Sequence, residues 1–418
     1  MFKIMLVASI LLGSIVSAVT LPTQINRNEN IAEINAGDYQ SLQAALDAVP
    51  ETGGRVVIPS GTYEITAPLR LKTGDVRIEG SGNSTHIVNV NEEGGSALVI
   101  AHEKMRDVKT NDRLWRVQVA NLRITGNPKS GNGIHAILVN EIFLHNVTVS
   151  HHGGDGVLLD YCYEDARVAD CLITYNKQVG LNLPGCHDIV VSANQFEENF
   201  DAVKIADGFN LCMSGNNLDD HLRHGVIIEN TYGSVVSGNM IEECQGTAII
   251  LDRDCYGNTI SANVIAHNGA GVDLRDAHGI AVSANTFTLM TQPALKIGES
   301  SGRVAVTGNN FCNSYIGEGK VRRNTDDLMA AGIQLESTSN IAISGNVFSS
   351  LQTKAIAVDD SKPKSVLFSN NVLVDVESDH SALADEKSNN VVDSNIVSDK
   401  RLWEDLSQCA QACAGTAT

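Results

Sequence analysis

The chain has 418 residues and a formal net charge of −19 at neutral pH. This acidic balance argues against a nucleic-acid-binding protein, because phosphate binding needs a basic surface. Hydrophobic residues make up 43% of the sequence but aromatic residues only 5%, with 36 glycines and 8 prolines. Such a composition favours stacked sheets of small aliphatic side chains over a globular enzyme with a thick mixed core.

The N-terminus predicts an export signal. Lys3 precedes an apolar stretch over residues 4–15, and Val16-Ser17-Ala18 are the small residues typical of a cleavage site. We therefore predict a signal peptide over 1–18, a linker over 19–36, and a protein secreted to the extracellular space or the periplasm. A membrane anchor fits less well, because the stretch is short for a span and no second one follows.

The segment from 37 to 82 predicts one helix and three strands. Residues 40–49 carry apolar side chains on one side, as an amphipathic helix does. Residues 56–58, 63–65 and 76–78 are predicted to be short strands. Because an unpaired end of a stack of strands exposes backbone edges and core, we interpret the helix as a cap over that end.

A repeat of about 23 residues follows, over 133–395. Each copy has a Gly or Ala, here called the mark, that opens an apolar-x-apolar triplet. The marks stand at Gly133, Gly156, Gly180, Ala202, Gly225, Ala248, Gly271, Ala294, Gly332 and Ala355. Their spacings are 23, 24, 22, 23, 23, 23, 23, 38 and 23 residues, which predicts a solenoid.

Each copy contains short strands separated by turns and no helical period, so the predicted fold class is all-β, a parallel β-helix solenoid over 37–400. A polar residue follows each mark by 13 to 15 residues. These are Asn146, Asp170, Asn194, Asn216, Asn239, Asn263, Asn285, Asn309, Asn346 and Asn370. Stacked one coil above another, their amides can donate to one neighbour and accept from the next, which predicts a structural ladder.

The segment before the repeat resembles the N-terminal part of the pectate-lyase-like superfamily. The similar residues are Gly37-Asp38-Tyr39, Leu42-Gln43-Ala44-Ala45, Gly53-Gly54, Val57-Ile58-Pro59, Gly61-Thr62-Tyr63 and Ile78-Glu79-Gly80. With the coils, the resemblance covers about 350 residues. It implies a right-handed helix and a group that includes lyases, hydrolases, epimerases and phage tail proteins, so it predicts the fold but leaves the reaction open.

Ionisable residues concentrate on the outward positions of the middle coils, where such a solenoid has a long groove. Carboxylates bind hydroxyls or calcium, and Arg and Lys neutralise a uronate. We predict catalytic roles for Asp201, Lys204, Arg223, His224 and Arg275. We predict substrate binding by His221, Asp252, Arg253, Asp273 and Lys296, and calcium binding by Asp201, Asp252 and Asp273.

Two reactions are compatible with parts of this group. Asp201 and His224-Gly225 partly match the polygalacturonase-like hydrolase pattern, but Val179 stands where that pattern needs another Asp one coil earlier. A hydrolase of that type needs two carboxyl groups. A lyase needs a base beside a uronate carboxylate and a cation to stabilise the enolate charge, and those residue types are present.

The remaining expectations concern loops and cysteines. The 38-residue unit predicts an inserted loop over about 312–328, with Lys320, Arg322 and Arg323 available to an acidic chain. Cys162 and Cys186 stand six residues after successive marks and are candidates for a disulfide. The tail over 401–418 predicts a cap on the second end, where Cys409 and Cys413 could close a small loop.

We therefore expect a secreted enzyme that acts on a polysaccharide or oligosaccharide, as a lyase on a uronate-containing glycan. A hydrolase, an epimerase and a carbohydrate-binding surface protein without catalysis are the alternatives. We expect no nucleic-acid or membrane partner, and either a monomer or a side-by-side homotrimer.

Overall fold

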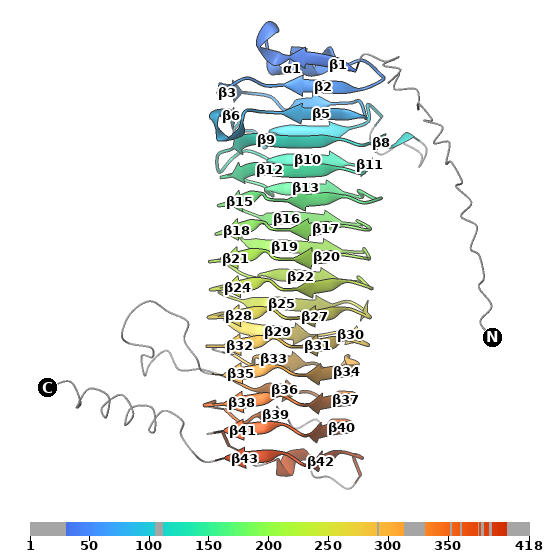
Figure 1. Ribbon diagram of the computed structural model, residues 1–418, viewed down its shortest axis with the longest axis vertical. Coiled ribbons are helices and arrows are strands. Elements are labelled where there is room, and N and C mark those ends of the chain that lie inside the picture. The colour runs from blue at the N-terminus through green and yellow to red at the C-terminus, as the bar shows by residue number, and fades with distance from the viewer. Residues whose placement is uncertain are drawn as a thin grey trace, which may run out of the picture. The chain divides into compact units, whose positions relative to one another are not determined.

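Short parallel strands wind into a column in the computed structural model (Figure 1). It describes residues 31–104, 112–290, 292–312, 331–351, 353–359, 362–374, 376–377, 380–383 and 387–398. The predicted signal peptide over 1–18, the insertion beyond Cys312 and the tail over 401–418 lie outside these residues. None of the helices in the described ranges is long and apolar enough to cross a membrane.

One sheet runs the length of the column and contains 12 strands within the described residues. Their bounds are β4 Leu69–Leu71, β7 Leu98–Ala101, β10 Ile134–Ile137, β13 Val157–Asp160, β16 Val179–Pro184, β19 Asp201–Ala206, β22 Val226–Glu229, β25 Thr247–Asp252, β29 Ala270–Leu274, β33 Leu295–Ile297, β36 Ile333–Leu335 and β39 Ile356–Val358. We call it the long sheet.

Two further strands complete each coil. In the middle coils the first of these strands are β14 Arg167–Ala169, β17 Val190–Ser192, β20 Cys212–Ser214, β23 Val235–Ser237, β27 Thr259–Ser261 and β31 Ala281–Ser283. The second are β15 Leu172–Thr174, β18 Gln195–Glu197, β21 Asn217–Asp219, β24 Met240–Glu242, β28 Val264–Ala266 and β32 Thr286–Thr288. All pair in parallel with the equivalent strand one coil away.

The register confirms the predicted period. In the long sheet Val203 lies opposite Val226, and Leu295 opposite Ile333, so the marks superpose even across the 38-residue unit. The residues one and three positions after each mark are buried along the middle coils and form one continuous core. The burial explains the period, because an aliphatic side chain must recur wherever a coil passes the same point of the core.

The asparagine ladder is confirmed from Asn194 onward, with one shift. Each side-chain amide donates to the side-chain oxygen one coil later at 2.9–3.0 Å through Asn194, Asn216, Asn239, Asn263, Asn285, Asn309, Asn346, Asn371 and Asn395. Asn371 replaces the predicted Asn370. Asn146 and Asp170 are exposed, and each stands one residue before the ladder position of its coil. In the coil of Asp170 that position is occupied by Cys171, whose N–H donates to Asn194 Oδ1.

A second interior column, not predicted, runs beside the turn that leads back into the long sheet. Its members are His152, Asn176, Asn199, His221, Cys244 and Asn268. The His152 N–H donates to Asn176 Oδ1, and the Cys244 N–H to Asn268 Oδ1. Two buried histidines therefore stand in a column otherwise occupied largely by asparagine.

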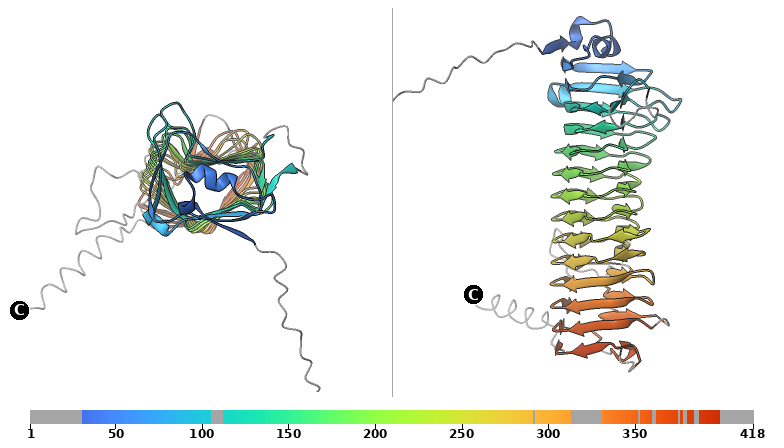
Figure 2. Two further views of the ribbon diagram at one scale, coloured as in Figure 1. Left: turned by 90° about the horizontal axis from the view of Figure 1, so that it is seen from above. Right: turned by 90° about the vertical axis from the view of Figure 1, so that its right-hand side faces the viewer.

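The N-terminal end is covered by helix α1, Leu42–Asp47. The Ser41 hydroxyl oxygen caps it by accepting the Ala44 N–H at 3.1 Å, and Leu46 is among the side chains it buries. Seen from above, the helix lies across the end of the column (Figure 2). The predicted cap is confirmed, although residues 32–35 are not linker but strand β1, Ala32–Asn35, paired with β2, Gly54–Val57.

At the other end a 3₁₀ turn, Ser381–Leu383, buries Leu383 in the core, but no helix as long as α1 lies across the last coil within the described residues. Strands β42, Val391–Asp393, and β43, Ile396–Ser398, form the last coil, and the Ile396 side chain is 63% exposed. The predicted disulfide is wrong, because Cys162 and Cys186 are free buried thiols in this structure. The Cys186 thiol instead donates to the Leu159 carbonyl oxygen.

Replacing Asn263 by Ala should destabilise the column sharply. Its side chain makes four hydrogen bonds, to Asn239 N–H and Nδ2, the Val236 carbonyl and Asn285 Oδ1. Unpaired buried groups cost about 1–3 kcal/mol each, so we expect a loss of at least about 2 kcal/mol in urea unfolding.

The matched control is Asn310→Ala. Asn310 directly follows the ladder residue Asn309 but is exposed and outside the ladder, so its replacement should change the unfolding free energy by less than about 0.5 kcal/mol. Equal effects of the two substitutions would contradict a structural role for the ladder.

Candidate active site on the long sheet

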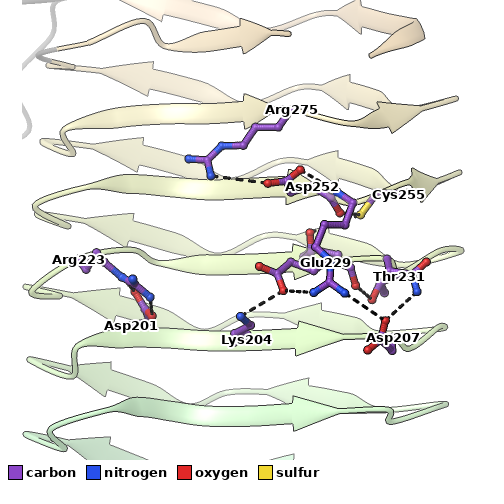
Figure 3. A network of polar contacts seen from close by, with 12 residues as sticks. Asp201, Lys204, Asp207, Arg223, Glu229, Thr231, Asp252, Cys255 and Arg275 are labelled. Carbon is purple, nitrogen blue, oxygen red and sulfur yellow. Dashed lines mark hydrogen bonds and ion pairs between the residues drawn. The ribbon is translucent and has the colours of Figure 1, made fainter. Parts of the chain in front are cut away.

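The outward residues of the long sheet carry three linked groups of charges over β19 to β29. The groups come from three places in the coil: the residues just before the mark, the second residue after the mark, and the turn just after the strand. Figure 3 shows Asp201 and Arg223 near the start of the strands, with Lys204, Glu229, Asp252 and Arg275 further along them. The site is thus spread across the width of the sheet.

The first group is built around Asp201, whose side chain is 1% exposed. Its carboxylate accepts the Arg223 Nε–H at 2.8 Å, the Arg223 Nη2–H, and the His224 backbone N–H at 3.0 Å. The guanidinium lies 4.5 Å from the centre of the Phe200 ring. The Asp201 carboxylate raises the pKa of Arg223, so the arginine stays charged, while its 45% exposed side chain remains open to a ligand.

His224 is fixed in one tautomer by its neighbour. Its Nδ1 accepts the Thr247 N–H at 3.0 Å, so the proton of the neutral ring is on Nε2. Partial burial lowers the pKa of His224, although the Asp201 carboxylate opposes this shift. At neutral pH the ring is therefore a hydrogen-bond donor through Nε2 rather than a base.

The second group joins three coils through Glu229. Its Oε2 lies 3.2 Å from Lys204 Nζ and 3.0 Å from Arg253 Nη1, and Arg253 also reaches Asp207 at 3.8 Å. Two cations thus share one carboxylate oxygen.

The third group lies one coil further on. Arg275 Nε donates to Asp273 Oδ2 at 2.8 Å, and Arg275 Nη1 lies 3.8 Å from Asp252 Oδ2. The other Asp273 oxygen, Oδ1, is buried and has no hydrogen-bond partner within the described part of the chain. The contact that fixes the Asp273 carboxylate is therefore the one from Arg275.

The register explains how these groups relate. Lys204, Ile227, Ile250 and Asp273 lie opposite one another on successive strands. Coils rise by about 4.8 Å, so Lys204 and Asp273 are separated by about 14 Å. The two isoleucines between them are buried, so the charged residues around them form the surface.

The structure therefore brings together Asp201, Arg223 and His224, and beside them Lys204, Asp252, Arg253, Asp273 and Arg275. Lys296 lies further along the same face, 2.9 Å from Glu336. Gln334 also bonds Glu336 and lines a hollow of about 350 Å³ that includes Pro293. This hollow extends the candidate surface beyond the cluster.

Two predictions do not fit this arrangement. His221 is fully buried in the second interior column, so it has no exposed surface with which to bind a substrate. Asp201, Asp252 and Asp273 do not converge, since none belongs to the groups of possible metal ligands found among the described residues. Each has an arginine partner instead, so these aspartates do not fit a shared calcium ion.

Glu229 and Asp155 were not among the predicted site residues. Glu229 is the hub of the second group, and only its turn position marked it in the sequence. Asp155 accepts the Val179 N–H at 3.0 Å and Asn182 Nδ2–H at 2.9 Å, and burial raises its pKa. It lies two coils before Asp201, with Val179 directly opposite Asp201 between them.

Comparison with known proteins places the sequence in a family. Residues 76–218 and 164–311 match the family described as right-handed β-helix region. The chain belongs to this family. A search of curated proteins found no match.

Solved structures share the fold at low sequence identity. The mannuronan C-5 epimerase AlgE6 A-module of Azotobacter vinelandii is similar with a TM-score of 0.57 and 16% identity, over 88% of this chain and 100% of that one. DFA-IIIase of Arthrobacter chlorophenolicus A6 is similar with a TM-score of 0.52 and 14% identity, over 87% and 99%.

A viral protein is similar as well. ORF18 of Geobacillus virus E2 has a TM-score of 0.51 and 15% identity over 68% of this chain, which spans 62% of that protein. These similarities establish the right-handed β-helix fold. The reaction has to be inferred from the residues of the site.

The buried histidines should make the protein less stable in mild acid. Burial lowers the pKa of His152 and of His221 from 6.5 to about 4. Between pH 6.5 and 4 the unfolded chain binds a proton at each position and the folded chain does not. The free energy of unfolding therefore decreases as the pH is lowered. Each histidine should cost on the order of 3 kcal/mol by pH 4.

The variant His221→Asn, which restores the residue type of its column, isolates this effect. The difference in unfolding free energy between variant and wild type, measured by urea titration from pH 7 to 4, should grow in favour of the variant as pH falls. A difference independent of pH would contradict the buried neutral histidine.

Proposed function

We propose that the protein is a polysaccharide lyase that cleaves a uronate-containing glycan by β-elimination on the outer face of the long sheet. The observation that carries the proposal is the placement of Lys204 and the Asp201–Arg223–His224 group on neighbouring coils of one face. The β-helix neighbours act on saccharides according to their names, which supports an enzyme of this class.

The cations suit an acidic glycan. Arg223 and Arg275 are each 45% exposed while held by Asp201 and Asp273. A guanidinium that is already oriented loses less freedom when it binds a carboxylate, and it pairs with both carboxylate oxygens. We assign to Arg223 the uronate carboxylate, which it neutralises so that the neighbouring carbon can lose its proton.

Lys204 is assigned as the base. The unprotonated form of the Lys204 amine takes the proton from the carbon beside the uronate carboxylate, and the negative charge spreads onto that carboxylate. The bond to the glycosidic oxygen on the next carbon then breaks and a carbon–carbon double bond forms. The ammonium on Lys204 returns the proton to the leaving oxygen, and the His224 Nε2–H donates a hydrogen bond to the carboxylate.

Hydrolysis is supported less well. An inverting hydrolase needs a carboxylic acid and a carboxylate base about 6.5–9.5 Å apart, both able to reach the substrate. Asp155 and Asp201, two coils apart, are the pair closest to that pattern. Asp201, however, is 1% exposed and bonded on both oxygens, so it is not free to transfer a proton.

Epimerisation is the second candidate, favoured by the similarity to the mannuronan C-5 epimerase module. It begins with the same proton abstraction and differs in the fate of the carbanion. The carbanion is reprotonated from the opposite face, and the glycosidic bond stays intact.

Lys204→Ala should lower turnover of the susceptible uronate polymer by roughly 10²–10⁴-fold, the usual contribution of a positioned base. Turnover is followed by ultraviolet absorbance of the unsaturated chain ends on a panel of uronic-acid polymers. Lys364→Ala, at an exposed lysine of β40, Lys364–Ser369, serves as the control and should retain full activity. Unchanged turnover by Lys204→Ala would refute the assigned base.

Incubation in heavy water separates the two candidate reactions. A lyase should generate ultraviolet-absorbing ends without deuterium in the uncleaved polymer, while an epimerase should place deuterium at the epimerised carbon without new ends. Nuclear magnetic resonance of the recovered polymer measures both. Deuterium incorporation with no absorbance would replace the lyase by an epimerase.

A further inference from the structure

A second hollow lies beside the candidate site, at the corner where each coil turns from its third strand back into the long sheet. Its volume is about 590 Å³, and its lining includes Asn127, His151, Tyr175, Lys177 and Leu222. Leu222 directly precedes Arg223 in the chain. At this point of the chain the lining of the hollow adjoins the Asp201–Arg223–His224 group.

One wall of this hollow is a fixed turn over residues 126–132. Asn127 Nδ2 donates to the Asn89 carbonyl at 3.1 Å and to the Asn91 carbonyl at 2.9 Å. Asn127 Oδ1 accepts the Lys129 N–H at 2.9 Å. Side-chain bonds to the backbone of a neighbouring coil hold the wall in place before any ligand arrives.

The floor of the hollow presents two large side chains with apolar surface. Tyr175 is 39% exposed and Leu222 45% exposed, although both are large and hydrophobic in part. The His151 ring stacks on Tyr175 with centroids 5.0 Å apart and planes at 26°. An aromatic ring and an aliphatic side chain among amide and charged groups form the lining expected of a small-molecule site.

The charges around the ring select the ligand. Glu197, and then Glu198 and Asp220, raise the pKa of Tyr175, so its hydroxyl remains a donor at all ordinary pH values. Glu197 lies opposite Asp219, and Asp219 opposite Glu242, which extends the negative charge along the same edge. Lys177 is the one lysine among the described residues of the lining, and these carboxylates outnumber it. A uronate would therefore be repelled here, whereas the hydroxyls of an uncharged sugar can donate to the carboxylates.

We propose that this hollow binds a neutral saccharide residue, with its apolar face against Tyr175 and Leu222. This inference rests on the proposed function in one respect: the neutral saccharide residue is taken to belong to the same glycan as the uronate that binds Arg223. The substrate class is then a mixed glycan that contains both neutral sugars and uronates, rather than a uniform polyuronate.

The test is direct binding, measured by titration calorimetry with neutral tetrasaccharides built from glucose, mannose, galactose or xylose. Wild type should bind at least one of them. Tyr175→Ala should weaken that binding at least about tenfold, because the ring supplies the stacking surface. Tyr175→Phe keeps the ring and should bind within about threefold of wild type.

Tyr232→Ala is the matched control, since Tyr232 is 49% exposed on a turn outside the hollow. It should bind like wild type. Unfolding curves that match wild type show that Tyr175→Ala is folded, as expected for a partly exposed side chain. Absence of binding to every neutral tetrasaccharide, or equal binding by wild type and Tyr175→Ala, would overturn the proposal.

Binding of neutral tetrasaccharides and turnover of uronate polymers are measured in separate experiments. The proposed hollow and the proposed lyase activity can therefore be refuted independently. Neutral binding that depends on Tyr175, with no turnover of any uronate glycan, would keep the hollow and remove the proposed function. Turnover of a uniform polyuronate that is unaffected by Tyr175→Ala, without neutral binding, would keep the lyase and remove the hollow.

Discussion

The vertical hydrogen bonding between parallel coils is the constraint on which everything else in this molecule depends. It places each residue directly over one that is about 23 positions later, at a rise of about 4.8 Å. A side chain therefore has a chemical neighbour that is distant in sequence and close in space. The Asn263 amide can bond Asn239 and Asn285 at once only because this register holds over both intervals.

The same constraint explains why the candidate site is a set of mixed charges rather than a patch of one sign. Residues at equivalent turn positions are brought within a few ångströms, so like charges there would repel and opposite charges pair. Glu229 meets Lys204 and Arg253 from the coils on either side. The net charge of −19 is not spread evenly, since cations accompany the carboxylates on the long sheet, whereas carboxylates predominate along the edge near Tyr175.

The fold could be predicted from the sequence because its period is imposed by burial, and buried positions tolerate few residue types. The prediction failed where one residue in a turn changes the register. Asn370 and Asn371 are adjacent, and only the geometry of the turn decides which faces inward. His221 failed for a related reason, because it looks like its polar neighbours Asp219 and Asp220 but points into the second column. The calcium prediction considered which residue types lie along a face but not where their side chains point. In the structure the aspartate side chains contact arginines and do not meet at a common point.

Asp201 shows why position must be read with contacts before a role is assigned. From the sequence we predicted that Asp201 is catalytic, because a carboxylate before the mark matches part of a hydrolase pattern. In the structure the carboxylate is covered, while Arg223 and the His224 backbone are both bonded to it. The carboxylate orients these two residues, of which Arg223 is 45% exposed and His224 presents a fixed Nε2–H. A buried carboxylate with every acceptor occupied orients a cation better than it transfers a proton, so this site is better suited to stabilising a negative charge on a substrate than to supplying an acid.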